Sequence, residues 1–111
     1  MQRLLPYRRI RKATIVKFSL QTGQQNIEWT ELSETWQRIE ELGYDGCWTI
    51  DHFLPTGTRD VNGPCMDGWA VLAALAAETK KLRLGTLVTG NLFRNPALLA
   101  KTATTIDHIS H

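Results

Sequence analysis

The chain has 111 residues, of which 42% are hydrophobic and 22% are charged, and this composition is typical of one soluble globular domain with a modest core. The formal net charge of +2 conceals an asymmetry, because five of the 13 basic residues lie before position 13, whereas the first acidic residue is Glu28. The rest of the chain has 8 basic and 11 acidic residues, and this mildly acidic body argues against a nucleic-acid-binding domain. No apolar run has the length of a membrane span.

Residues 1–13 form a basic segment with three interpretations. The segment has the arginines of an organelle-targeting peptide, although it is short and poor in serine, and it has the charge of an arm for nucleic acid or anionic lipid. The favoured interpretation is a disordered extension, so the folded domain is expected over residues 14–111. The lack of a secretory signal and the presence of only two cysteines, Cys47 and Cys65, favour the cytoplasm.

The first part of the domain has the pattern of a β-α-β unit. Residues 14–20 are rich in β-branched and large apolar side chains and predict a strand. Residues 29–42 change to the period of a helix. The apolar stripe of this helix consists of Leu32, Trp36, Ile39 and Leu42. Gly43 provides a left-handed helix end, and Gly46 opens a second strand over residues 46–50.

The second part of the domain repeats this alternation. A loop rich in glycine and proline precedes Asp67, which is a suitable N-cap for a second helix. Residues 82–88 predict a third strand, and Gly85 within it indicates either a bulge or the close approach of another group to the backbone. Asn95 and Pro96 are suited to the cap and first position of a third helix. The buried stripe of that helix is predicted to consist of Leu99, Ala103, Ile106 and Ile109.

The order β-α-β-α-β-α, with connections too long for hairpins, predicts parallel strands joined by right-handed crossovers. An open doubly wound sheet and a (β/α)8 barrel both satisfy this order. A dinucleotide-binding sheet would have a glycine-rich turn after its first strand, whereas residues 21–25 contain Gly23 alone. The barrel is therefore favoured, and the chain is expected to form an N-terminal part of it with three β-α units.

Asp51 and His52 follow the second predicted strand directly. In β-α folds, catalytic groups project from the carboxyl ends of the strands, where the loops converge. An imidazole with an ordinary pKa near 6.5 exchanges protons close to neutral pH. Neighbouring side chains on an extended segment point in opposite directions, so a direct pair of the two is not assured. In the alternative interpretation Asp51 caps a turn and His52 packs in the loop, and the residues alone do not decide between the two.

Two other groups of residues have weaker functional signals. His108 and His111 are three positions apart, but no carboxylate or cysteine completes a set of metal ligands, so no metal site is predicted. Four tryptophans, including Trp48, have the chemistry of a stacking platform for nucleic acid. Because they fall on helix faces and on a strand, packing is the favoured explanation.

Several motifs, in the same order, resemble the bacterial-luciferase-like superfamily, and within it they are most similar to the deazaflavin (coenzyme F420)-dependent oxidoreductases. The resemblance extends over about residues 14 to 111. The motifs are Lys-Phe-Ser-Leu at 17–20, Glu-Leu-Gly-Tyr-Asp at 41–45, Trp-Thr-Ile-Asp-His-Phe at 48–53, Leu-Gly-Thr-Leu-Val-Thr-Gly-Asn at 84–91 and Arg-Asn-Pro-Ala-Leu-Leu-Ala-Lys at 94–101.

The resemblance implies a (β/α)8 TIM barrel and hydride transfer between F420 and an organic small molecule. The ring of the cofactor is then expected across the carboxyl ends of the strands, with Asp51 helping to hold it and His52 transferring a proton. The implied ring cradle consists of Leu87, Val88, Thr89, Gly90 and Asn91. The resemblance also implies a cis peptide bond between the first two residues of this cradle.

The resemblance leaves alternatives open. FMN-dependent luciferase-like monooxygenases usually have Glu-His-His-Phe where this chain has Asp51-His52-Phe53, which favours F420 over FMN. A barrel of this type needs about 250 residues, so the chain is expected to be an N-terminal portion, and an inactive fragment that acts only by association is the further alternative. The full-length family implies homo-oligomers and a small-molecule substrate, with no nucleic acid, membrane or metal partner.

Overall fold

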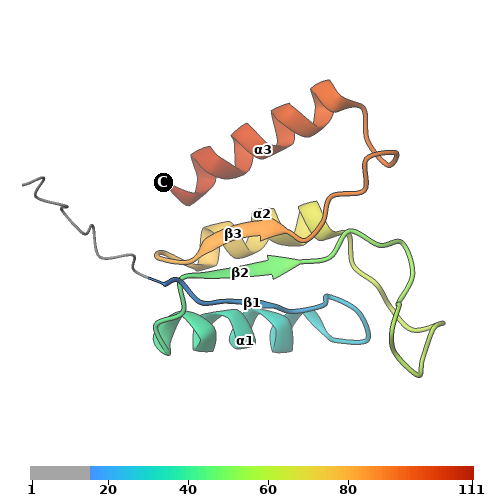
Figure 1. Cartoon of the computed structure of the whole chain (residues 1–111), viewed down its shortest axis with the longest axis horizontal. Helices are drawn as coiled ribbons and strands as arrows, with labels where there is room; N and C mark the ends of the chain where they lie inside the picture. Colours follow the sequence, from blue (N-terminus) through green and yellow to red (C-terminus); the bar gives the residue numbers. More distant parts are fainter. Residues whose placement is uncertain (1–15) are drawn as a thin grey trace, which may run out of the picture.

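The computed structural model describes residues 16–111, which form a three-stranded parallel sheet with three helices (Figure 1). The predicted extension at residues 1–13 lies outside the described residues. The elements, in chain order, are β1 (Ser19–Gln21), α1 (Trp29–Glu41), β2 (Gly46–Thr49), α2 (Gly68–Glu78), β3 (Arg83–Thr86) and α3 (Pro96–Ser110). The strand order in the sheet is β1-β2-β3. The predicted three parallel β-α units are therefore confirmed, and none of the described helices has the length and apolar character needed to cross a membrane.

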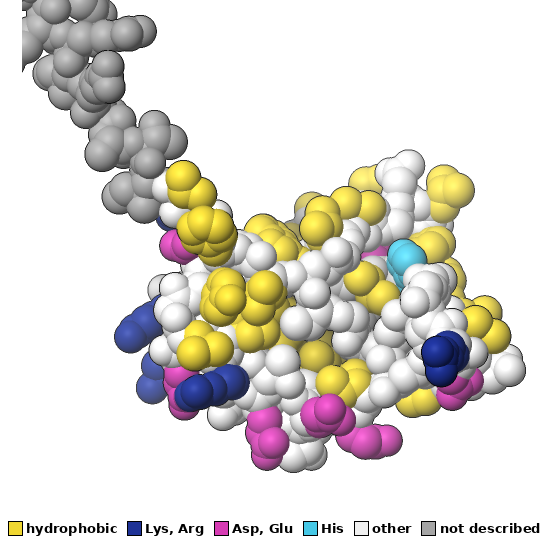
Figure 2. Space-filling view, turned by 60° about the horizontal axis from the view of Figure 1, so that its bottom comes forward, with side chains coloured by type: hydrophobic (Ala, Val, Ile, Leu, Met, Phe, Trp, Pro, Cys, Tyr) yellow, Lys and Arg dark blue, Asp and Glu magenta, His cyan; other side chains and the backbone are white. Residues whose placement is uncertain are grey.

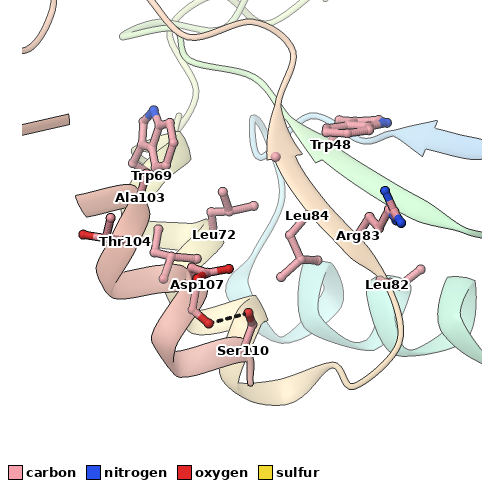
Figure 3. Close-up of a pocket in the computed structure, with 12 residues that line it drawn as sticks. Trp48, Trp69, Leu72, Leu82, Arg83, Leu84, Ala103, Thr104, Asp107 and Ser110 are labelled. Carbon is pink, nitrogen blue, oxygen red and sulfur yellow. Dashed lines mark hydrogen bonds between the residues drawn. The ribbon is translucent and has the colours of Figure 1, made fainter. Parts of the chain in front are cut away.

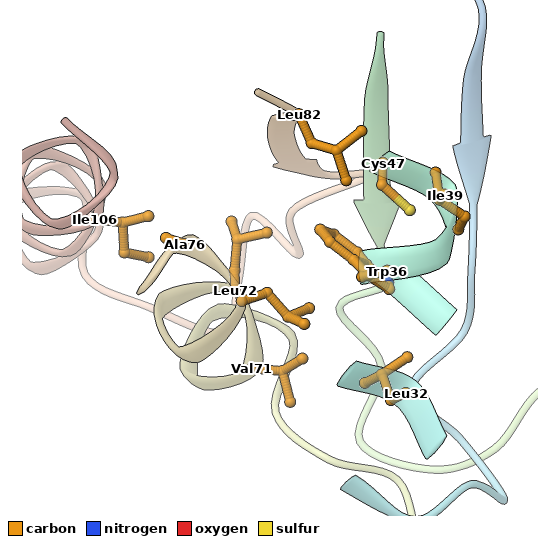
Figure 4. Close-up of a cluster of buried hydrophobic side chains, with 10 residues drawn as sticks. Leu32, Trp36, Ile39, Cys47, Val71, Leu72, Ala76, Leu82 and Ile106 are labelled. Carbon is orange, nitrogen blue, oxygen red and sulfur yellow. The ribbon is translucent and has the colours of Figure 1, made fainter. Parts of the chain in front are cut away.

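Helices α1 and α2 cover one face of the sheet, where the core lies. The register places Leu20, Cys47 and Leu84 side by side on that face, and Cys47 is completely buried there. Figure 4 shows the core side chains that α1, α2 and the sheet contribute between them. The helical members of this core are Leu32, Trp36 and Ile39 of α1, Val71, Leu72, Leu75 and Ala76 of α2, and Ile106 of α3. Complete burial of one large apolar side chain contributes about 1.5–3 kcal/mol.

The opposite face of the sheet has Trp48 in the middle strand, flanked in register by Gln21 and Gly85. A Cβ atom added to Gly85 would lie 2.3 Å from the Trp48 ring. The close approach predicted at Gly85 is therefore confirmed, because the indole occupies the space that any side chain there would need.

Helix α3 packs against α2 and stands away from β3 (Figure 1). A groove lies between α3 and β3 (Figure 3). The groove has a volume of about 730 Å³ and is lined mainly by α2, β3 and α3. Of the predicted stripe of α3, Ile106 is buried, and it lies on the side of α3 that faces the groove. None of the predicted site residues lines this groove.

Several local predictions are confirmed by the backbone. Gly43 ends α1 with a φ of +83°, a conformation that only glycine adopts at little cost. The Asp67 carboxylate caps α2 by accepting hydrogen bonds from the backbone N–H groups of Trp69 and Ala70, and the Asn95 side chain accepts one from Ala97 at the start of α3.

Several predicted boundaries were wrong by one or more residues. Within residues 16–20 the first strand begins only at Ser19, whose register partner Gly46 is the first residue of β2, and β2 ends at Thr49 instead of residue 50. The third strand ends at Thr86 and not at residue 88. Leu42 is 59% exposed and not part of the core, because α1 ends at Glu41 and Leu42 is its C-cap.

Candidate active site

The loops after β2 and β3 leave the sheet side by side, because the two strands are parallel neighbours with Thr49 opposite Thr86. This arrangement brings Asp51 to the predicted ring cradle: the Gly90 backbone N–H donates a hydrogen bond of 2.8 Å to Asp51 Oδ2. Asp51 and Gly90, a member of the predicted cradle, therefore lie together at the carboxyl ends of β2 and β3.

Asp51 is 4% exposed, and an arginine compensates its charge. Arg94 donates one hydrogen bond of 2.6 Å to Asp51 Oδ2 and another of 2.5 Å to Asp67 Oδ2. The hydrogen bond to Asp51 raises the pKa of Arg94 above its usual value, and the charges of Asp67 and Asp51 add to this effect against partial burial of the guanidinium. Arg94 thus ties the loop after β3 to the end of β2 and to the cap of α2.

Arg94 was missed as a site residue by the sequence prediction. It was part of a recognised motif, but nothing local to it indicates which carboxylates it contacts. Both recorded hydrogen bonds of Asp51 end on Oδ2. Within residues 16–111, Asp51 Oδ1 therefore has no protein donor and is available to a donor on a ligand.

His52 has a different environment from its neighbour. Its side chain is exposed, and its Nδ1 lies 2.7 Å from the Thr56 hydroxyl oxygen. The two residues are thus adjacent in sequence but have separate partners, because successive side chains on an extended segment diverge. Among the described contacts, no hydrogen bond joins Asp51 to His52.

The peptide before Asp51 is held by Gln24, which follows β1. Gln24 is completely buried, and its amide donates to the carbonyls of Ile50 at 2.6 Å and Met66 at 3.0 Å. The same amide accepts a hydrogen bond of 3.1 Å from the Ile50 N–H. Gln24 therefore satisfies both backbone groups of the residue that precedes Asp51.

The next two side chains continue this support along the loop after β2. Gln25 donates to the Thr56 carbonyl at 2.8 Å and accepts from the Thr56 N–H at 3.0 Å. Asn26 donates to the Thr58 hydroxyl and to the Asp60 carbonyl. Consecutive amide side chains thus replace the regular secondary structure that this loop lacks. The sequence analysis missed them, since glutamine and asparagine in a turn are common and give no specific signal.

The predicted cradle lies beside Asp51, and the exposed side chains of Leu87 and Val88 form what we call the apolar shelf. The peptide bond between Leu87 and Val88 is cis, as the resemblance implied. The side chains of these two residues are exposed, and Gln21 donates a hydrogen bond of 2.7 Å to the Leu87 carbonyl. Thr89 is partly buried and contacts the Thr86 hydroxyl, while Asn91 is exposed.

An aromatic contact joins the two loops on their outer side. The rings of Phe53 and Phe93 have centroids 4.3 Å apart. A Cβ atom on Gly90 would lie 2.3 Å from the Phe93 ring, so any larger residue at position 90 would require this ring to move. Exposed large apolar side chains surround this contact and contribute to the hydrophobic surface of the molecule (Figure 2 shows one face). Those on the two loops are Phe53, Leu54, Val61, Leu87, Val88, Leu92 and Phe93.

The family described as Luciferase-like monooxygenase matches residues 13–111. The chain belongs to this family. It is 37% identical over 82 residues to an F420-dependent glucose-6-phosphate dehydrogenase of Amycolatopsis mediterranei (strain U-32). This match covers 73% of this chain and 24% of the relative. A protein of the same description from Intrasporangium calvum is 38% identical over 81 residues, covering 72% of this chain and 24% of the relative. The chain thus spans about a quarter of the length of these relatives.

Two solved structures are similar to this chain. An F420-dependent secondary alcohol dehydrogenase in complex with an F420-acetone adduct has a TM-score of 0.65 and 30% identity, and the match covers 78% of this chain and 27% of that one. A riboflavin lyase with modified FMN and riboflavin has a TM-score of 0.69 and 24% identity, covering 85% and 27%. The second likeness concerns the fold alone. The three β-α units are therefore part of a luciferase-like fold.

Proposed function

We propose that this chain forms one wall of the active site of an F420-dependent oxidoreductase, which transfers hydride between the deazaflavin and an organic small molecule. The observation that carries the proposal is a buried carboxylate, Asp51, with one oxygen left for a ligand beside an exposed apolar shelf. The relatives described as F420-dependent dehydrogenases support the same cofactor.

The shelf fits a planar ring with a polar edge. Leu87 and Val88 offer exposed apolar side chains on which the face of a ring can pack. Asp51 lies next to them through its contact with the Gly90 N–H, and its Oδ1 accepts a hydrogen bond from an N–H or O–H group of the ring edge. Thr89 and Asn91 are proposed to line the same site.

His52 is proposed to transfer the proton that accompanies the hydride. When F420 is bound, it supplies an acceptor for two electrons and one hydrogen as hydride. With F420 bound and an alcohol as substrate, the cofactor would accept the hydride of the C–H bond, and the imidazole of His52 would accept the O–H proton as the carbonyl forms. The imidazole then returns to its neutral form by releasing this proton to water, which its exposure allows.

We also propose a cellular setting and partners. The free thiols of Cys47 and Cys65 suit the reducing conditions of the cytoplasm. The partners are proposed to be a small-molecule substrate and further copies of the chain in the full-length protein. The basic segment at residues 1–13 is proposed to lie outside the domain.

The test is a fluorescence titration of the chain with F420 and, separately, with FMN. We expect F420 to bind more tightly than FMN, and we expect Asp51→Asn to weaken F420 binding about tenfold or more, because the variant loses a charge-assisted hydrogen bond. Asp107→Asn, which changes an exposed carboxylate of α3, serves as the matched control. Tighter binding of FMN would favour the monooxygenase alternative. Binding of neither at micromolar protein would support the inactive-fragment alternative.

A further inference from the structure

We propose that Thr56 is a positioning residue that determines which nitrogen of the His52 imidazole carries the proton. The inference rests on the proposed function, in which His52 moves a proton. Thr56 keeps the proton on Nδ1 of the neutral ring, so that the lone pair of Nε2 is left free to accept a proton.

The first support is that the tautomer of His52 has a single protein determinant. Nδ1 lies 2.7 Å from Thr56 Oγ1, and no other described residue forms a hydrogen bond with the ring. In a neutral imidazole, the partner of one nitrogen decides the protonation of the other. The ring is exposed, so burial does not fix its orientation.

The second support is that Thr56 is itself held in place. Both of its backbone groups bond to the Gln25 amide, at 3.0 Å for the N–H and 2.8 Å for the carbonyl. Gln25 is in turn bridged through its backbone to Cys65, whose thiol donates to the His52 carbonyl at 3.3 Å. The segment 52–56 is therefore fixed at both ends by residues from elsewhere in the chain, although most of it is exposed.

The Thr56 hydroxyl can donate to Nδ1 or accept from it, and the proposed role of His52 as a base at Nε2 requires the arrangement in which the hydroxyl accepts. A hydroxyl oxygen accepts a hydrogen bond from Nδ1–H of both the neutral and the protonated imidazole. The contact then persists while Nε2 takes up a proton from an alcohol and releases it again. If the hydroxyl instead donated to Nδ1, the neutral ring would carry its proton on Nε2 and could not act there as a base.

The experiment is a long-range ¹H–¹⁵N correlation spectrum of the ¹⁵N-labelled chain at about pH 8.5, where imidazoles of ordinary pKa are neutral. The signals of His52 are assigned by their loss in His52→Asn. His108 and His111, which are exposed at the end of α3, are internal references for rings without this threonine. We expect the Nδ1–H pattern for His52 and a different pattern for the two references.

Three variants sharpen the test. Thr56→Val keeps the shape of the side chain and removes the hydroxyl, and we expect the Nε2–H form to become the major one. Thr56→Ser restores the hydroxyl and should restore the Nδ1–H form. Gln25→Ala keeps the Thr56 hydroxyl but removes the hydrogen bonds that hold the Thr56 backbone. We expect this variant to have an intermediate population of the Nδ1–H form.

The outcomes separate this inference from the proposed function. An Nε2–H pattern in the unchanged chain, or an unchanged pattern in Thr56→Val, would overturn the role of Thr56 whatever the cofactor titration gives. Conversely, the tautomer is measured without cofactor, so failure to bind F420 would reject the function and leave the control of the tautomer standing. Amide spectra of each variant establish that the fold is retained.

Discussion

The two loops that build the candidate site are held by different kinds of interaction. The loop after β2 is held by neutral amides, of which Gln24 is completely buried. The loop after β3 is held by charge, since Arg94 joins Asp51 to Asp67 with a side chain only 13% exposed. The comparison indicates that the loop after β2 takes its backbone support from the uncharged amides of Gln24 and Gln25, whereas the buried carboxylate of Asp51 is balanced by an arginine.

The largest loss of stability is expected in the loop after β3, which Arg94 holds. Arg94→Met should destabilise the chain by about 3 kcal/mol, because it leaves the buried carboxylate of Asp51 without a compensating charge. Urea denaturation measures the change. Arg38→Met is the matched control, since the ion pair of Arg38 with Glu41 is more than 60% exposed on both sides and should cost less than about 1 kcal/mol. Equal losses in the two variants would show that Arg94 has no special role.

A smaller loss of stability, which is still large, is expected in the loop after β2. Gln24→Leu should destabilise by about 2 kcal/mol, because the N–H and carbonyl of Ile50 lose buried hydrogen-bond partners. Gln37→Leu changes an exposed glutamine of α1 and should be nearly neutral. The loss in Gln24→Leu should be the same at pH 5 and pH 8, and a strong pH dependence would contradict a purely neutral support.

Glu40 lies away from the candidate site and serves as a charged reference, because its contribution to stability is expected to depend on pH. Glu40 Oε1 accepts hydrogen bonds from the backbone N–H groups of Lys80, Lys81 and Leu82. Burial alone would raise the pKa of Glu40, but these three bonds and the charge of Lys81 outweigh it and lower the pKa below 4.5.

Because the folded pKa of Glu40 is lowered, its stabilisation is complete above pH 4.5 and is lost as the pH falls through the folded value. We expect Glu40→Gln to cost about 1 kcal/mol at pH 7. The difference from the unchanged chain should shrink below pH 4.5. Urea denaturation between pH 3 and pH 7 measures this difference in the free energy of unfolding. A difference that grows on acidification would contradict a lowered pKa of Glu40.

The smallest loss of stability is expected at Asp67, which both caps α2 and forms an ion pair with Arg94. Asp67→Ser keeps an N-cap for α2 but removes the ion pair to Arg94, and because the Asp67 side chain is 49% exposed the loss should be about 0.5 kcal/mol. Asp67→Ala removes the cap as well and should cost about 1 kcal/mol more. Thermal denaturation by circular dichroism compares the two. Equal stability of the serine and alanine variants would mean that the cap contributes nothing.

The sequence by itself determined the order and type of the elements, because these depend on local patterns. The apolar period of residues 29–42, the left-handed end at Gly43 and the caps at Asp67 and Asn95 each act within one or two turns of chain. The position of Asp51 and His52 at the carboxyl edge followed from the order of parallel strands. The family resemblance added the cis peptide and the expected cradle.

Only the tertiary structure decided which polar groups support the site. Arg94 finds its carboxylates 27 and 43 residues away, and the Gln24 amide bonds to the Ile50 backbone 26 residues away. The hydrogen-bonding capacity of these side chains is common to every arginine and glutamine in the sequence. Their partners are set only when the crossovers bring three loops to one edge of the sheet, where burial makes an unpaired polar group costly.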